Sequence, residues 1–212
     1  MDAIRADDLI GLFQSWRDIF AAQREFLIAL DGKVGDSDLG ITMAKSFAAA
    51  ADTVATEGEG AGLTKLLRSA GAIMAKTAPS TMGTLTATGF LRGAKVLEGV
   101  DAIGTPEAAA FWRAFATGIA ERGKARLGDK TILDVLDPVA GALEAAAASG
   151  LALAPALRAA ADAADAALER TKAMVAQHGK AAAFQEKTVG LQDAGATVGV
   201  LLVKTMSDFV GR

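Results

Sequence analysis

Hydrophobic residues recur at helical spacing along almost the whole chain. Near the N-terminus the stripe consists of Leu9, Phe13, Trp16, Phe20, Phe26 and Leu27, mostly three or four residues apart. This spacing places hydrophobic side chains on one face of an amphipathic helix. No stretch of the sequence shows a convincing alternation of hydrophobic and polar residues, which would indicate a strand. The pattern therefore predicts an all-α protein.

Breaks in the pattern divide the chain into eight predicted helices. Pro79 ends one helix because proline disfavours a helical backbone in the preceding residue, and Thr105-Pro106 begins another as a cap and first-turn pair. The predicted helices span residues 6–30, 40–58, 62–77, 80–99, 105–123, 131–149, 155–179 and 193–212. Pro138 either kinks the sixth helix or marks its first turn. No Pro/Ser-rich linker separates them, so residues 1–212 are expected to form one helical domain.

The composition excludes several classes of protein. Hydrophobic residues make up 51% of the chain and many are alanine, which favours closely packed helices. The net charge of −3 comes from mixed signs without a basic stripe, which argues against nucleic acid as a partner. The absence of cysteine and the single histidine, His178, exclude disulfides and a polyhistidine zinc site. Without a signal peptide or a bilayer-length apolar run, we expect a cytoplasmic protein with no membrane partner.

Three aspartates provide the strongest chemical signal. Asp31, Asp36 and Asp38 fall within eight residues, where a predicted helix ends in a turn containing Gly35 and followed by Gly40. Glycine allows backbone conformations that other residues avoid. Oxygen ligands gathered on a compact turn suit a hard cation such as Mg²⁺ or Ca²⁺. The alternative is a helix cap on a solvated turn.

Two better-known ion and phosphate motifs do not fit. Asp36 and Asp38 would fill the first and third positions of an EF-hand loop, but its twelfth position, which needs a bidentate glutamate, is Phe47. The segment Gly118 to Lys124 nearly matches a Walker A loop. It has Ala125 in place of Ser or Thr, and no strand precedes it. Both motifs are therefore rejected.

Two further turns and the single histidine are weaker signals. Gly128-Asp-Lys-Thr131 and Gly190-Leu-Gln-Asp-Ala-Gly-Ala-Thr197 each place a hydroxyl or carboxylate near a helix start. A helix N-terminus favours an anion such as phosphate, but each motif taken singly is more often only a cap. His178 is expected to end the seventh helix in a structural role, favoured by the helix dipole.

Taken together and in order, these segments resemble the nucleotide-binding L subunit of dihydroxyacetone kinases. That family has Leu-Asp, then Gly-Asp-x-Asp-His-Gly-x-Asn-Met, which correspond here to Leu30-Asp31 and to residues 35–43. Its Gly-Asp-Lys-Thr-Met, Gly-Arg-Ala and Gly-His-x-Asp-Pro-Gly-Ala correspond to residues 128–132, 179–181 and 190–196. The resemblance covers most of the chain and implies a barrel of eight antiparallel helices.

The resemblance also implies a nucleotide site with magnesium. Asp31, Asp36 and Asp38 would hold two Mg²⁺ ions that bridge the phosphates of ADP or ATP. The nucleotide contacts carried over from the family are Leu39, Gly40, Thr42, Met82, Gly83, Gly123, Thr131, Ile132, Lys180, Asp193, Ala194 and Gly195. Gly123 and Ile132 would flank the base, and residues 193–195 would form part of the loop over the nucleotide.

This chain departs from the family pattern at several positions, including residues 78–83, where the family has a glycine-rich stretch. Leu39 replaces a histidine, Thr42 an asparagine, Ala194 a proline and Lys180 an arginine. Metal binding should survive because all three aspartates are present, whereas nucleotide affinity and base preference are open. Lysine at position 180 also replaces a guanidinium group, which can bind a phosphate through two N–H donors at once, with an ammonium group that acts as a single point of charge.

The implied activity is phosphoryl transfer to a small ketose that a separate K subunit holds, so this chain should be inactive alone. No catalytic side chain is expected beyond the metal and phosphate ligands. The donor is either ATP or a bound ADP rephosphorylated by a phosphotransferase-system protein, and the ketose is dihydroxyacetone or a tetrose. Two alternatives remain: a regulator that binds MgADP without turnover, and a helical interaction module whose aspartate turn is only a solvated cap.

Overall fold

The regular elements of the chain are nearly all helical. A computed structural model describes residues 1–58 and 60–212. The α-helices are α1 (Ala6–Ala22), α2 (Arg24–Asp31), α3 (Leu39–Glu57), α4 (Leu63–Thr77), α5 (Thr81–Val96), α6 (Thr105–Gly123), α7 (Leu133–Ala148), α8 (Leu153–Thr171) and α9 (Ala194–Val210). The remaining elements are the 3-10 helix η1 (Lys180–Thr188) and the short strands β1 (Ile4–Arg5) and β2 (Ala102–Ile103).

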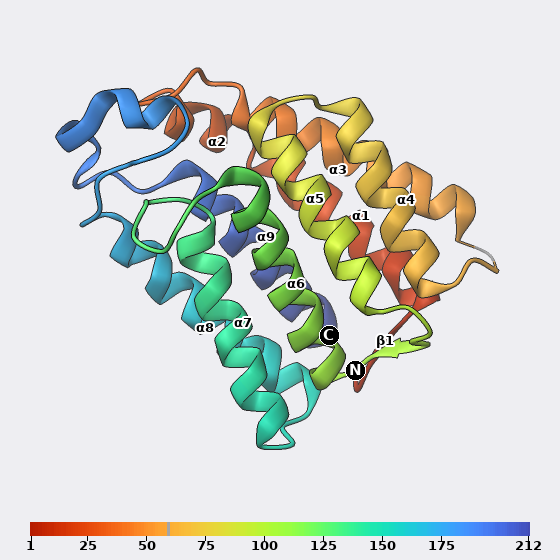
Figure 1. Cartoon of the computed structure of the whole chain (residues 1–212). Helices are drawn as coiled ribbons and strands as arrows, with labels where there is room; N and C mark the ends of the chain where they lie inside the picture. Colours follow the sequence, from red (N-terminus) through yellow and green to blue (C-terminus); the bar gives the residue numbers. More distant parts are fainter. Residues whose placement is uncertain (59) are drawn as a thin grey trace.

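Helix α1 and helices α3 to α9 close into a barrel (Figure 1). Each of α3 to α9 packs on its neighbour in sequence, α1 packs on α3, and α9 returns to α1. Helices joined by short connections run antiparallel, so the ring alternates in direction. At one end β1 and β2 pair with Ile4 opposite Ile103, and the two chain termini lie nearby. The predicted all-α barrel of eight antiparallel helices is confirmed.

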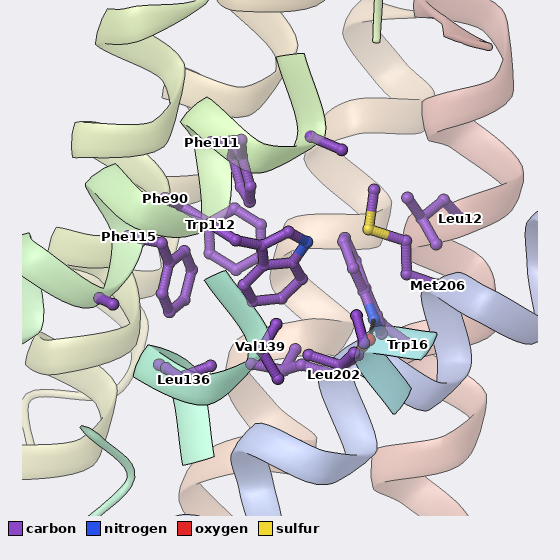
Figure 2. Close-up of a cluster of buried hydrophobic side chains, with 14 of the residues drawn as sticks. Leu12, Trp16, Phe90, Phe111, Trp112, Phe115, Leu136, Val139, Leu202 and Met206 are labelled. Carbon is purple, nitrogen blue, oxygen red and sulfur yellow. Dashed lines mark hydrogen bonds between the residues drawn. The ribbon is translucent and has the colours of Figure 1, made fainter. Parts of the chain in front are cut away.

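Aromatic side chains fill the centre of the barrel (Figure 2). Phe90 on α5 is fully buried, and its ring centroid lies 5.3 Å from that of Phe115 and 5.6 Å from that of Trp16. The indole N–H of Trp16 donates to the carbonyl of Leu202 at 2.9 Å, which joins α1 to α9 across the closure of the ring. These contacts between helices distant in sequence hold the barrel together.

Near the N-terminus the structure differs from the predicted helices. The single predicted helix over residues 6–30 is divided at Gln23, where ψ is 4°, into α1 and α2. The bend lets α2 pack Leu27 and Leu30 against α3. A Cβ built at Gly40 would lie only 2.1 Å from the carbonyl oxygen of Arg24, so glycine is required for this close packing. The strands β1 and β2 were also not predicted, because two-residue strands show no periodicity.

The prediction for the seventh helix was wrong at its end. The helix α8 stops at Thr171 instead of Gly179, so His178 does not end a helix. The chain then continues into η1, which the sequence did not indicate. Pro138 lies inside α7, which begins at Leu133. Among the described residues, no helix has the combined length and apolar character needed to cross a membrane.

Candidate nucleotide and metal site

The three aspartates converge in the loop between α2 and α3. One carboxylate oxygen from each of Asp31, Asp36 and Asp38 lies within 4.8 Å of the other two. Asp31 ends α2, and its Oδ2 accepts the backbone N–H of Asp38 at 3.1 Å and of Leu39 at 3.4 Å. These bonds fix the Asp31 carboxylate against the start of α3. The loop therefore brings the carboxylate oxygens of three aspartates that are separated in sequence into one cluster.

The loop depends on glycine and on an unusual backbone angle. A Cβ built at Gly35 would lie 2.2 Å from Oδ1 of Asp31, so any side chain at this position would displace that carboxylate. Ser37, between the other two aspartates, has a φ of 64° in the left-handed region. Such a conformation is uncommon outside glycine and is found where the surrounding structure imposes it.

The electrostatics of the cluster favour a cation. Burial, followed by the nearby Asp31 carboxylate, raises the pKa of Asp38. Lys180 from η1 reaches across and forms an ion pair with Asp36, so a cationic group already approaches the cluster. The donor set contains only oxygen, which matches the preference of Mg²⁺ and Ca²⁺ and is unsuited to softer metals. The residues present thus fit a hard divalent cation.

A cavity of about 470 Å³ opens beside the aspartates. Its walls come from the loops before α3, α5, α7 and α9 and from the start of η1. The predicted site residues that line it are Asp31, Asp36, Asp38, Leu39, Met82, Thr131, Ile132, Lys180, Asp193, Ala194 and Gly195. The fold therefore gathers into one cavity predicted site residues that are up to 164 positions apart (Asp31 and Gly195).

Four predicted contact residues, Gly40, Thr42, Gly83 and Gly123, are not among those lining the cavity. Thr42 is buried in α3, and its backbone N–H donates to the carbonyl of Asp38 at 2.9 Å. The N–H of Gly83 donates to the Ser80 hydroxyl at 3.1 Å and so caps α5. Gly123 is the last residue of α6. Direct contact between these four residues and a ligand stays a prediction.

Several residues line the cavity that the sequence had not assigned to a nucleotide or metal site. Leu30, Leu85 and Leu191 contribute an apolar wall, and Lys130 and His178 add polar groups. Nε2 of His178 lies 2.9 Å from Oδ2 of Asp129. Lys130 belongs to the Gly128–Thr131 turn, which the family resemblance had marked without giving this lysine a role. The motif could have drawn attention to Lys130, but only the structure shows that this lysine is buried.

Asp193 is the most perturbed acid of the site. Its carboxylate caps α9 by accepting the N–H of Ala196 at 2.6 Å. Burial raises the pKa of Asp193 to about 6, while the bond from Ala196 and the charge of Lys130 oppose the rise. The folded protein therefore holds this proton more tightly than the unfolded chain does.

The raised pKa of Asp193 predicts a pH-dependent stability. Because its folded pKa of about 6 exceeds the ordinary value of 3.8, the free energy of unfolding should fall as pH rises from about 4 to about 6 and then level off. Asp193→Asn keeps an acceptor for the N–H of Ala196 but cannot ionise. At pH 8 the free energy of unfolding of this variant should therefore exceed that of wild type by on the order of 1–3 kcal/mol. Urea unfolding across this pH range checks the prediction.

The comparison of the two pH profiles isolates Asp193 from other titrating groups. Asp101→Asn, at an exposed loop position, serves as the matched control. Parallel profiles for wild type and Asp193→Asn between pH 4 and 6 would contradict the prediction.

Comparison with known proteins supports the interpretation of the site. A family model described as the DAK2 domain matches residues 33–208, which include Asp36 and Asp38 and begin just after Asp31. The PEP-dependent dihydroxyacetone kinase, ADP-binding subunit DhaL, of Escherichia coli is 31% identical over 90% of each chain. A D-erythrulose kinase of Mycolicibacterium smegmatis is 34% identical over 93% of this chain and 34% of its own length.

A solved structure is similar over nearly the whole chain. The dihydroxyacetone kinase from C. freundii, in complex with AMP-PNP and Mg²⁺, has a TM-score of 0.70 and is 25% identical. The match covers 94% of this chain and 33% of that one, so this chain spans about a third of the kinase chain. With a family match over most of its length and a helical barrel carrying the aspartate cluster, this chain belongs to the DAK2 domain family.

Proposed function

We propose that this chain is the ADP/ATP-binding subunit of a dihydroxyacetone-type kinase, and that residues 1–212 act as one nucleotide-binding domain. In this function, a phosphoryl group passes from a magnesium-bound nucleotide to a small ketose. The observation that carries the proposal is the set of three aspartate oxygens within 4.8 Å of one another at the edge of the cavity. The similarity to a kinase solved with AMP-PNP and Mg²⁺ supports it.

The aspartates are proposed to hold the metal. Asp31, Asp36 and Asp38 present more carboxylate oxygens than one octahedral Mg²⁺ would need alongside phosphate and water, which supports the proposal of two ions. Bound Mg²⁺ would neutralise negative charge on the terminal phosphates. The residues that line the cavity would position the phosphates and exclude water from them. Phosphoryl transfer depends chiefly on such positioning and charge stabilisation.

The nucleotide is proposed to extend from the aspartates across the cavity. Lys180 pairs with Asp36, so its ammonium is close enough to the cluster to contact a phosphate once metal is bound. Met82, Ile132 and Leu191 provide apolar surface for the base or ribose. Asp193 caps α9 and residues 194–195 begin it, at a helix end where backbone N–H groups favour an anion.

The ketose is proposed to be held by a K subunit that covers the aspartate end of the barrel. The E. coli relative is named as an ADP-binding subunit of a PEP-dependent kinase, which supports a bound ADP that a phosphotransferase-system protein rephosphorylates. The similarity to a D-erythrulose kinase supports a tetrose as the alternative to dihydroxyacetone.

Reconstitution tests this function. The purified chain is mixed with a dihydroxyacetone-binding K subunit, Mg²⁺ and either ATP or phosphoenolpyruvate with phosphotransferase proteins, and the phosphorylated ketose is measured. We expect product only when both subunits are present, and the productive donor identifies the mode of transfer. MgADP binding without product from either donor would favour the regulator. No nucleotide binding at all would favour the helical interaction module.

A further inference from the structure

The chain between α8 and α9 forms a strap, residues 172–192, beside the aspartate loop. Figure 1 shows this segment in blue next to α2 and the orange loop that follows it. Two arms, residues 172–178 and 188–192, lead to and from an outer part, residues 179–187, most of which is exposed. The outer part carries Lys180, and the second arm continues into the residues that line the cavity before α9. The position of the strap therefore decides the shape of one side of the site.

Lys130 fastens both arms of the strap. Its side chain is buried, with 4% of the residue exposed. Its Nζ donates to the carbonyl oxygens of Met174 at 3.2 Å, Thr188 at 2.7 Å and Leu191 at 2.7 Å. An ammonium group has three N–H donors, and here each has an acceptor on the strap. One side chain thus binds the first arm once and the second arm twice.

Further bonds join the arms to each other and to the turn that carries Lys130. The Thr188 hydroxyl accepts the N–H of Ala176 at 3.0 Å, and the N–H of Gly190 donates to the carbonyl of Lys172 at 2.7 Å. The N–H of Gln177 donates to the carbonyl of Asp129 at 3.0 Å. By contrast, among the described residues of the outer part, the pair of Lys180 with Asp36 is the one side-chain hydrogen bond outside the strap. The strap has a fixed base and a lightly held outer part.

Burying the ammonium group of Lys130 costs free energy, which its hydrogen bonds to the strap offset. Burial lowers the pKa of Lys130, which reflects the cost of removing its charge from water. Its backbone φ is 59°, a left-handed conformation that non-glycine residues seldom adopt. An apolar side chain would fill the same space without either the charge or the need for three aligned carbonyls. The geometry is therefore that of a side chain selected for the bonds it makes to the strap.

We propose that Lys130 is a positioning residue for the nucleotide: by pinning both arms of the strap, it holds Lys180 and residues 191–195 against the cavity and slows nucleotide release. This inference rests on the proposed function. Lys130 acts through the strap and takes no part in holding the metal. Its removal should loosen the strap while leaving the aspartate loop and the barrel intact.

The test compares Lys130→Met, which has a similar length but no N–H donors, with wild type. Lys204→Met, which removes an exposed lysine paired with Asp165 on the outside of the barrel, is the control. Hydrogen exchange is followed at the amides of Ala176, Gln177 and Gly190. Release of a fluorescent ADP is measured by stopped flow with Mg²⁺, and Mn²⁺ alone is titrated by its paramagnetic signal.

In Lys130→Met we expect faster exchange at these three amides and MgADP release faster by on the order of ten- to a hundredfold, as for loss of hydrogen bonds to a charged group. Affinity for Mn²⁺ alone and exchange within α5 and α6 should match wild type. Thr188→Val removes the acceptor for Ala176 without touching the buried charge, and it should change release in the same direction by a smaller factor. If Lys130→Met does not fold, as judged by circular dichroism, Thr188→Val decides the matter.

The outcomes separate this inference from the proposed function. Unchanged exchange in the strap overturns the role of Lys130 as a tether. A loosened strap with unchanged MgADP release shows that the tether is only structural and overturns the positioning role. If wild type binds no MgADP, the proposed function fails, and the positioning role that rests on it fails with it, while the exchange measurements still decide whether Lys130 fastens the strap.

Discussion

Replacing Asp36 with asparagine is expected to abolish the stabilisation of this protein by MgADP. Asp36 contributes one of three carboxylates whose oxygens lie within 4.8 Å of one another. Asparagine has nearly the same shape but lacks the negative charge through which a carboxylate strengthens the binding of a hard cation. A ligand present at about a hundred times its dissociation constant adds roughly 2.7 kcal/mol to stability. For a chain of this size, that stabilisation raises the melting temperature by about 5–10 °C.

The measurement is thermal melting of wild type and Asp36→Asn with ADP or ATP, each in Mg²⁺ and in EDTA. The melting temperature of wild type should rise only when nucleotide and Mg²⁺ are both present, and that of the variant should not change under any of these conditions. Asp52→Asn, an exposed substitution on α3, should behave like wild type. A full shift by MgADP in Asp36→Asn would show that this carboxylate does not hold the metal. No shift in wild type, with no ADP released from denatured protein, would remove the basis of the proposed function.

Replacing Phe90 with alanine should produce the largest loss of stability among single changes in the barrel. Its ring centroid lies within 6.1 Å of those of Phe13, Trp16, Phe47, Phe111 and Phe115, which come from three other helices. Truncation removes buried apolar surface and leaves a cavity that the surrounding rings can only partly fill. Such substitutions cost about 3–5 kcal/mol. Urea unfolding followed by tryptophan fluorescence and by circular dichroism measures the loss.

Phe26→Ala provides the matched control, because it makes the same chemical change on α2 where the residue is 49% exposed. Its effect should stay within about 0.5 kcal/mol, as for ordinary surface substitutions. If Phe90→Ala lowered the free energy of unfolding by less than about 1 kcal/mol, either the surrounding rings would have repacked or Phe90 would not make these aromatic contacts.

The sequence determined the helical barrel and the group of carboxylates at its candidate site. Helical periodicity predicted α3, α4 and α6 to within one residue at each end, because their hydrophobic stripes are bounded by glycine, proline or threonine. The aspartates could be recognised as a candidate site for a hard cation because all three lie in one short turn, where local spacing alone brings them together. The family was evident from four short motifs in a fixed order, even where Leu39, Thr42, Lys180 and Ala194 depart from it.

Only the tertiary structure decided how the walls of the site are built. The bend at Gln23 follows from the packing of α2 on α3, where the absence of a side chain at Gly40 makes room for the carbonyl of Arg24. The residues around Gln23 do not themselves indicate this contact. Residues 172–178 are compatible with a longer α8, yet the Met174 carbonyl bonds to Lys130, 44 positions away, and the chain forms the strap instead. The burial of Lys130 and the raised pKa of Asp193 arise in the same way. Helix faces and short turns depend on neighbours in sequence, whereas burial, desolvation and hydrogen bonds between distant loops exist only once the barrel has closed.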